Sequence, residues 1–184
     1  MKHSLGCTAI FLGMLSLGVL GARAQSPQPR MPMGEQTSGM TAQVAAPAET
    51  LKITFGDKSA TWTVATLAAL PHVTVTVHNE HTKADETYSG VPLIALLAPL
   101  GVSEHPRGKD LRLYVVAEGS DLYEVVYASG EITPDVSSST VMVADTENGK
   151  ALAADGPLKL IATGEKRPAR WVRNLVAIKV FAAE

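Results

Sequence analysis

The segment Gly156–Val180 carries the strongest structural signal in the chain and reads GPLKLIATGEKRPARWVRNLVAIKV. Two apolar runs within it, Leu158–Ala162 and Trp171–Val180, predict β-strands. A compact turn, Gly164–Arg170, joins them. Four cationic side chains fall within eight positions, Lys166, Arg167, Arg170 and Arg173. Guanidinium groups hold phosphate or carboxylate in a fixed orientation, so the segment predicts an anion-binding site at the junction of two strands.

The amino-terminal residues are typical of a secretory signal peptide. Residues 1–24 have a basic start, an uncharged apolar run over Ala9–Leu20, and small residues at Ala22 and Ala24. That run is shorter than the roughly 20 residues that span a bilayer. We therefore expect a soluble exported protein, periplasmic or secreted, with no membrane span in the mature chain. Cleavage after Ala24 removes Cys7, the only cysteine in the sequence.

Composition divides the remainder into a leader and one domain. Residues 25–49 are rich in Pro, Gln, Met, Gly and Ala and show no apolar period, which predicts a disordered leader. Residues 50–184 fit one domain of ordinary size. Without Lys2 and Arg23, the mature chain has 14 of the 16 cationic side chains against 18 anionic ones, a net charge of −4. One basic cluster on an acidic background argues against a nucleic-acid partner.

Short stretches of alternating apolar and polar residues predict half-buried strands across this domain. Besides the two strands of the opening segment, the expected strands are Leu51–Phe55, Ala60–Thr63, His72–His78, Leu111–Ala117, Leu122–Tyr127 and Thr140–Ala144. Helices are expected at Val64–Leu70 and from Pro92, a loop at Asn79–Glu86, and a hairpin turn at Asn148-Gly149. No strand-helix-strand unit repeats, so the pattern predicts an α+β fold in which strands dominate.

Three stretches, in this order, resemble the molybdopterin-binding domain of the sulfite oxidase class. They are Tyr88–Leu93 leading into a leucine-rich helix, Asp121–Tyr123, and Gly156–Leu158 running through to Arg170–Arg173. The chain is also similar to small exported single-domain proteins of that class. The resemblance implies a strand-rich mixed fold and a molybdopterin cofactor. It also implies that the counterparts of Arg170 and Arg173 contact the pterin and its phosphate.

The same resemblance implies a cysteine thiolate that binds molybdenum, and Thr76–Asn79 holds the place of that cysteine here. A neutral imidazole at His78 is a different donor from a thiolate. Leu122 stands where glycine is usual in the class, a residue that lets another backbone or a ligand approach closely. The implied cofactor site, lined by Arg170, Arg173, Tyr123 and His78 on one concave surface, therefore lacks its sulfur ligand.

A separate pattern, His78-x-x-His81 in an acidic loop, is compatible with a zinc or copper site in an exported protein. Two histidines need further ligands whose positions the sequence does not define, so exposed loop histidines are the alternative interpretation. The chain has neither a Gly-x-Ser-x-Gly turn nor a glycine-rich phosphate loop. Their absence argues against a hydrolase and a nucleotide-binding protein.

Three functional hypotheses follow from these patterns. The first is a non-catalytic binding module that takes a small anion or the pterin cofactor, with Arg170 and Arg173 as its main contacts. The second is a molybdenum-cofactor oxidoreductase that holds the pterin without a protein thiolate. The third is a periplasmic metal-binding protein that uses His78 and His81. The sequence does not identify a protein partner.

Overall fold

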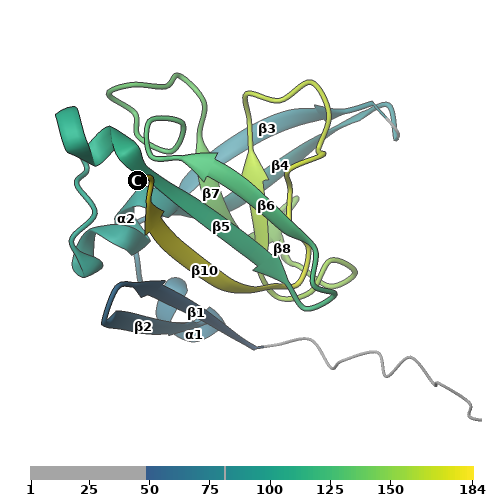
Figure 1. Ribbon diagram of the computed structural model, residues 1–184. Coiled ribbons are helices and arrows are strands. Elements are labelled where there is room, and N and C mark those ends of the chain that lie inside the picture. The colour runs from purple at the N-terminus through teal and green to yellow at the C-terminus, as the bar shows by residue number, and fades with distance from the viewer. Residues whose placement is uncertain (1–48, 81) are drawn as a thin grey trace, which may run out of the picture. The chain divides into compact units, whose positions relative to one another are not determined.

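Two β-sheets frame the part of the chain that the computed structural model describes, residues 49–80 and 82–184 (Figure 1). The first sheet has the order β2 (Lys58–Thr63), β1 (Thr50–Phe55), β10 (Leu175–Ala182), β5 (Leu113–Gly119) and β6 (Glu124–Ala128). The second has the order β3 (Val73–Asn79), β4 (Ala84–Pro92), β7 (Val141–Glu147) and β8 (Lys150–Ala151), and β9 (Lys159–Ala162) also pairs with β7. Strands β1 and β10 are parallel, and every other pair is antiparallel.

The predicted α+β fold dominated by strands is confirmed. Short helices complete it: α1 (Val64–Leu67), α2 (Leu93–Leu97) and the 3₁₀ turns Ala98–Leu100 and Gly108–Arg112. No helix among the described residues is long and apolar enough to cross a membrane. The predicted signal peptide, residues 1–24, and all of the predicted leader except Glu49 lie outside the described residues.

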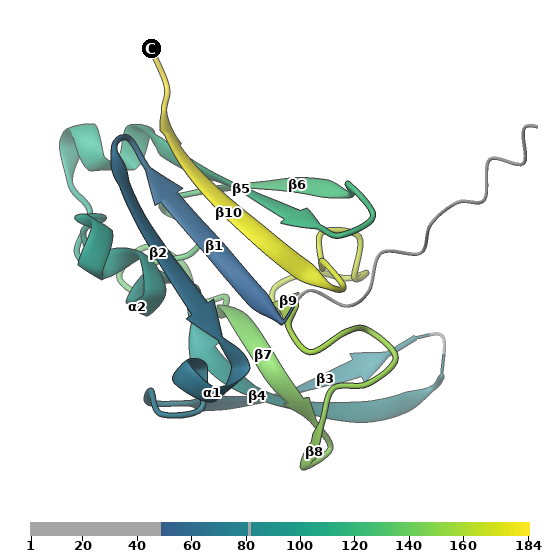
Figure 2. The ribbon, with the colours of Figure 1, turned by 90° about the horizontal axis from the view of Figure 1, so that it is seen from below.

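The main hydrophobic core lies where the inner faces of the two sheets meet, and α2 closes one end of it (Figure 2). Strand β7 contributes Val141 and Val143 to this core, whereas its Met142 and Ala144 pack in a second, smaller cluster. Alternate residues of a strand point to opposite faces. Strand β7 is therefore buried on both faces, which is why its sequence shows a continuous apolar run and not an alternation.

Several element boundaries differ from the sequence predictions. The helix predicted to reach Leu70 ends at Leu67, and Pro92 caps α2 from outside. The loop predicted over Asn79–Glu86 is much shorter, because β4 begins at Ala84 and pairs with β3 as a long hairpin. Its polar residues had suggested a loop, but one face of this hairpin is exposed and accommodates them.

The predicted strand Trp171–Val180 is wrong over its first four residues. Strand β10 begins only at Leu175, and Asn174 has a left-handed conformation with φ of 47°. Its backbone N–H donates to the carbonyl of Asp155 at 2.6 Å. Gly156 allows this contact, since a Cβ there would lie 1.8 Å from the Asn174 side chain. In contrast, the hairpin signal at Asn148-Gly149 is confirmed by positive φ angles at both residues between β7 and β8.

Gly90 lies at an irregularity in the ladder between β4 and β7. A Cβ at this position would lie 2.2 Å from the carbonyl oxygen of Val143, and that oxygen belongs to a buried strand that cannot easily move. We predict that Gly90→Ala lowers the free energy of unfolding by about 3 kcal/mol. Denaturant unfolding measures this change. Ser89→Ala is the matched control in the same strand, and an equal loss in both variants would contradict the steric explanation.

Leu122 has a left-handed backbone with φ of 67°, and its side chain is 78% exposed. A residue with a Cβ is strained in this conformation and glycine is not, so the backbone explains the preference for glycine here. We predict that Leu122→Gly raises the free energy of unfolding by about 0.5–1 kcal/mol, the relief of strain less the entropy that glycine gains in the unfolded chain. Leu122→Ala keeps the Cβ and serves as the control. Equal stability of the two variants in thermal unfolding would refute the assignment.

Candidate functional site

The four basic side chains between β9 and β10 lie in different surroundings. Lys166, Arg167 and Arg170 belong to the cationic turn Gly164–Arg170, and Arg173 follows it. Arg170 points back to the protein, where its guanidinium donates to Glu165 at 2.5 Å, to Glu131 at 3.0 Å and to the carbonyl of Val126 at 3.1 Å. The guanidinium also lies over the ring of Tyr127, 4.4 Å from the centroid. The hydrogen bond with Glu131 is the main cause that raises the pKa of Arg170. Arg170 is therefore occupied by groups of its own chain.

Two tyrosines of β6 and its flank hold the backbone of this turn. The hydroxyl of Tyr123 donates to the carbonyl of Ala169 at 2.5 Å, and that of Tyr127 donates to the carbonyl of Arg170 at 2.6 Å. Burial is the main cause that raises the pKa of Tyr127. Its hydroxyl therefore stays protonated and keeps donating across the physiological pH range. These two bonds anchor the turn to the first sheet.

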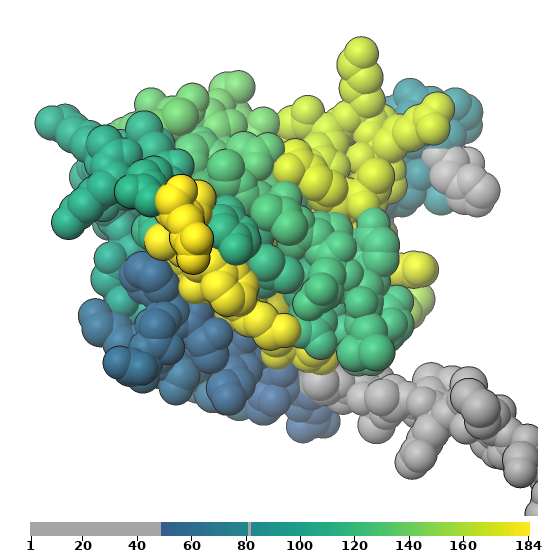
Figure 3. Space-filling model, in the orientation of Figure 1, coloured from purple at the N-terminus to yellow at the C-terminus, as the bar shows by residue number. Residues whose placement is uncertain are grey.

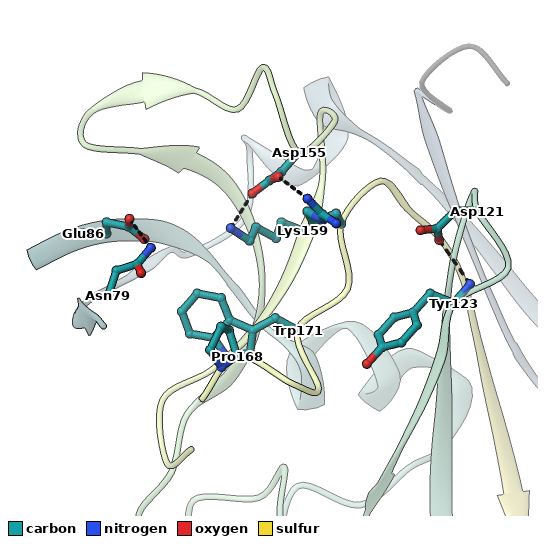
Figure 4. A pocket seen from close by; sticks show the side chains of 9 residues that line it. Asn79, Glu86, Asp121, Tyr123, Asp155, Lys159, Pro168 and Trp171 are labelled. Carbon is teal, nitrogen blue, oxygen red and sulfur yellow. Dashed lines mark hydrogen bonds and ion pairs between the residues drawn. The ribbon is translucent and has the colours of Figure 1, made fainter. Parts of the chain in front are cut away.

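The main pocket, of about 400 Å³, opens beside the turn and draws its walls from both sheets. Its lining is Asn79, Glu86, Asp121, Tyr123, Asp155, Lys159, Pro168, Trp171 and Arg173. Figure 4 shows Asn79 and Glu86 on one side, Asp121 and Tyr123 on the other, and Asp155 with Lys159 opposite Trp171. The pocket thus combines an indole ring with charges of both signs.

The three carboxylates of the main pocket are engaged by groups of the chain itself. Glu86 accepts from the side-chain amide of Asn79 at 2.6 Å and from the hydroxyl of Tyr88 at 2.8 Å. Asp155 accepts from Lys159 at 2.5 Å. Asp121 accepts from the backbone N–H of Tyr123 at 3.1 Å. Asp155 therefore has a cationic partner and Glu86 has two hydrogen-bond donors, whereas Asp121 has only one backbone donor.

Lys159 is the buried cation of this pocket, since only 7% of the residue is exposed. Its ammonium donates to Asp155 and, at 3.1 Å, to the hydroxyl of Tyr88. It lies 4.8 Å from the ring centroid of Tyr88 and 5.3 Å from that of Trp171. An ammonium has three N–H donors, so one donor stays available for a ligand. Burying this charge is favourable only because these partners surround it.

Arg173 supplies a second available cation. Its side chain is 69% exposed and makes one long contact, 3.8 Å, with Asp155. A guanidinium has five N–H donors, and this contact leaves most of them free to bind. Lys159 and Arg173 therefore present donors to the same pocket, whereas the neighbouring carboxylates are already bonded.

A second pocket, of about 340 Å³, adjoins the first and shares Asn79, Pro168 and Trp171 with it. Its remaining lining comes from β3 and the cationic turn, namely Thr76, Val77, His78, Glu80, Thr163, Glu165, Lys166 and Arg167. The Nδ1 atom of His78 lies 2.8 Å from Asp85, and half of the imidazole is exposed. His78 thus lines this second pocket with its imidazole held by Asp85.

The structure separates the four residues expected to line one concave surface. Tyr123 and Arg173 line the main pocket, His78 lines the adjoining one, and Arg170 lines a small pocket with Glu131 and Glu165. Arg170 and Arg173 point in different directions, because Arg170 pairs with Glu165 and Arg173 faces Asp155. They do not form a two-pronged clamp.

Sequence reasoning missed Lys159 as a site residue, although it lies within the segment Gly156–Val180. A lysine at the start of an apolar strand was the available signal, because a buried ammonium needs partners. His81, the second residue of the proposed zinc or copper pair, lies outside the described residues. Among the residues with described positions, no group of three His, Cys, Asp or Glu side chains is arranged to hold a metal ion.

Comparisons with known proteins bear mainly on the fold. No protein-family model matches the chain. A stretch of 82 residues is 33% identical to the DNA primase small subunit PriS of Thermoplasma volcanium, covering 45% of this chain and 23% of that protein. The crystal structure of the sulfane dehydrogenase SoxCD from Paracoccus pantotrophus matches with a TM-score of 0.56 and 24% identity, over 72% of this chain.

The chain spans only 38% of the SoxCD chain and less than a quarter of the primase subunit. The match with SoxCD is too distant in sequence to show more than the fold. It does show that the fold of this chain, over 72% of its length, resembles part of the SoxCD chain. The chain therefore has the strand-rich mixed fold that its resemblance to the molybdopterin-binding domain implied.

Proposed function

We propose that this chain is an exported, non-catalytic binding module on a sulfite oxidase-like fold, with a small anion or a pterin-type cofactor held in the main pocket. One observation carries the proposal. The carboxylates of that pocket are bonded internally, whereas Lys159 and Arg173 keep donors available. The signal-like residues 1–24 support export. The domain bounded by residues 50–184 would then be the functional unit.

The available hydrogen-bond donors of the pocket are suited to an anion. At Asp155 or Glu86, a cationic ligand would have to displace Lys159 or the Tyr88 hydroxyl, and a buried charge that loses its partner is costly. An anion would instead meet the spare donor of Lys159 and the guanidinium of Arg173. Trp171 lies beside them and can pack against a flat ring. A planar ring that carries a phosphate or carboxylate, such as a substituted pterin, satisfies all three groups.

The molybdenum centre of the sulfite oxidase class does not fit the donor atoms present. The described residues contain no cysteine, and the only one in the full sequence is Cys7. The imidazole of His78, which holds the expected place of the ligand, is bonded to Asp85 and lines the adjoining pocket. A neutral nitrogen in that position does not replace an anionic thiolate. These residues support binding of the organic part of the cofactor, and we derive no redox step from them.

We predict that protein purified from the periplasmic fraction of its native host begins at Gln25 and carries no stoichiometric molybdenum. Intact-mass spectrometry checks the amino terminus, and elemental analysis with mass spectrometry of the released small molecules checks the ligand. A pterin or another small anion is the expected finding. Stoichiometric molybdenum would refute the non-catalytic assignment, and a chain beginning at Met1 in the cytoplasmic fraction would refute export.

We predict that Arg173→Gln weakens binding of pterin-6-carboxylate about tenfold, because it removes a charge-assisted hydrogen bond. Calorimetric titration gives the affinity. The control is Arg170→Gln, which leaves Glu131 and Glu165 unpaired. It should lower the free energy of unfolding by about 1 kcal/mol, with little change in affinity. If Arg170→Gln abolished binding while Arg173→Gln had no effect, the ligand would occupy a different site.

A further inference from the structure

Strand β3 is an open edge of the second sheet. It pairs with β4 on one side, and the described residues provide no strand on its other side. Its seven residues, VTVTVHN, include no lysine, proline or glycine. Natural proteins usually protect a long edge strand with such residues or with a covering segment, because unpaired N–H and C=O groups bind other strands. An edge with this composition is suited to strand addition.

The second pocket lies along this edge. Thr76, Val77 and His78 line it one after another, although successive side chains of a strand point to opposite faces of the sheet. A pocket that touches all three must border the backbone of the strand. In an antiparallel pair, every second residue directs its N–H and C=O away from the partner strand. Among the described residues, the backbone groups of residues 73–78 form hydrogen bonds only within the ladder with β4.

The opposite wall of the pocket is cationic. Lys166 and Arg167 line it, and neither side chain has an ion pair or hydrogen bond with another described residue. Figure 3 shows the turn that carries them, in yellow-green, projecting from the surface near the blue-teal β3–β4 hairpin. The acidic residues of the pocket are neutralised, since Glu80 pairs with Lys83 at 2.6 Å and Glu165 pairs with Arg170.

Apolar surface lies between the edge and the cationic wall. Trp171 and Pro168 belong to both pockets, and Val77 and Trp171 each pack against the smaller hydrophobic cluster. A strand added to β3 would therefore direct alternate side chains toward this apolar surface. Its other side chains would lie where Lys166 and Arg167 can reach them.

We propose that β3 and the cationic turn form a docking groove for an extended acidic segment of a partner protein, which adds as a strand to the β3 edge. Backbone hydrogen bonds would give affinity, as in other cases of strand addition. Carboxylates at alternate positions would pair with Lys166 and Arg167, and this charge complementarity selects acidic partners. A small anion cannot satisfy a row of backbone donors and acceptors, whereas a peptide strand does so along its whole length.

This groove is independent of the proposed anion site. The anion site uses Lys159 and Arg173 of the main pocket, whereas the groove uses the backbone of β3 together with Lys166 and Arg167. The two pockets share the ring of Trp171, so substitution of Trp171 would not distinguish them. Substitution of the cationic side chains does.

A fluorescently labelled peptide of alternating Glu and Val, as long as β3, is the probe. Anisotropy titrations with the full mature chain measure its affinity, and hydrogen exchange measures protection of residues 73–78. We expect the peptide to bind and to slow exchange in β3. The matched peptide of alternating Lys and Val should bind about tenfold more weakly or not at all. Absence of binding by the acidic peptide, or protection confined to other strands, would overturn the proposal.

Charge reversal tests the cationic wall. The double variant Lys166→Glu/Arg167→Glu should weaken acidic-peptide binding about tenfold. The control is Arg107→Glu/Lys109→Glu, which reverses two exposed charges outside this pocket and should leave binding unchanged. Equal affinity of the two double variants would refute the role of the turn.

Two further measurements separate the alternatives. Arg173→Gln should not change peptide affinity, so loss of the anion site and loss of the groove are distinguishable. Sedimentation without peptide should show a monomer. A dimer whose β3 amides are already protected would instead assign the edge to a second copy of this chain and overturn the peptide proposal.

Discussion

The buried ammonium of Lys159 is the constraint on which the arrangement of the site depends. Strand β9 is buried on both faces, so a lysine within it must find partners or destabilise the fold. Asp155 and the hydroxyl of Tyr88 provide them, and the Tyr88 hydroxyl in turn donates to Glu86. One charge in a strand thereby orders donors and acceptors from β4, from β9 and from the segment that precedes β9. The same chain of bonds leaves the main pocket with available cations and occupied carboxylates.

The basic residues of the cationic turn have two different roles, one structural and one available for binding. Arg170 forms ion pairs with Glu131 and Glu165 and lies over the ring of Tyr127. Its charge is therefore balanced by groups of the same chain. Burial acts to raise the pKa of Glu131, but the hydrogen bonds from Arg170 and the Ala128 amide outweigh it and lower that pKa. With Arg170 fixed, the remaining cations of the turn and of the connection to β10 face outward. Arg170 thus fixes the conformation of the turn, whereas Lys166, Arg167 and Arg173 remain available to bind other molecules.

The likeness to SoxCD shows the fold and nothing beyond it. A fold supports different functions according to the side chains placed on it. Here the main pocket lies beside Trp171, and His78, which bonds to Asp85, lines the adjoining pocket. The open edge of β3 adds a surface where another chain can dock.

Local patterns in the sequence determined most of the strands, the hairpin at Asn148-Gly149 and the class of the fold, because alternation and turn preference act over a few neighbouring residues. They did not determine where β10 begins, since Asn174 turns the chain only through its contact with Asp155. Nor did they place the site. Arg170 and Arg173 are three positions apart, yet Glu131 and Glu165 draw one inward while the other faces the main pocket. Lys159 also bonds to Tyr88, which lies 71 positions away in the chain. Partners so distant in sequence meet only when the sheets pack, and for that reason tertiary structure alone decided which charges are free to bind.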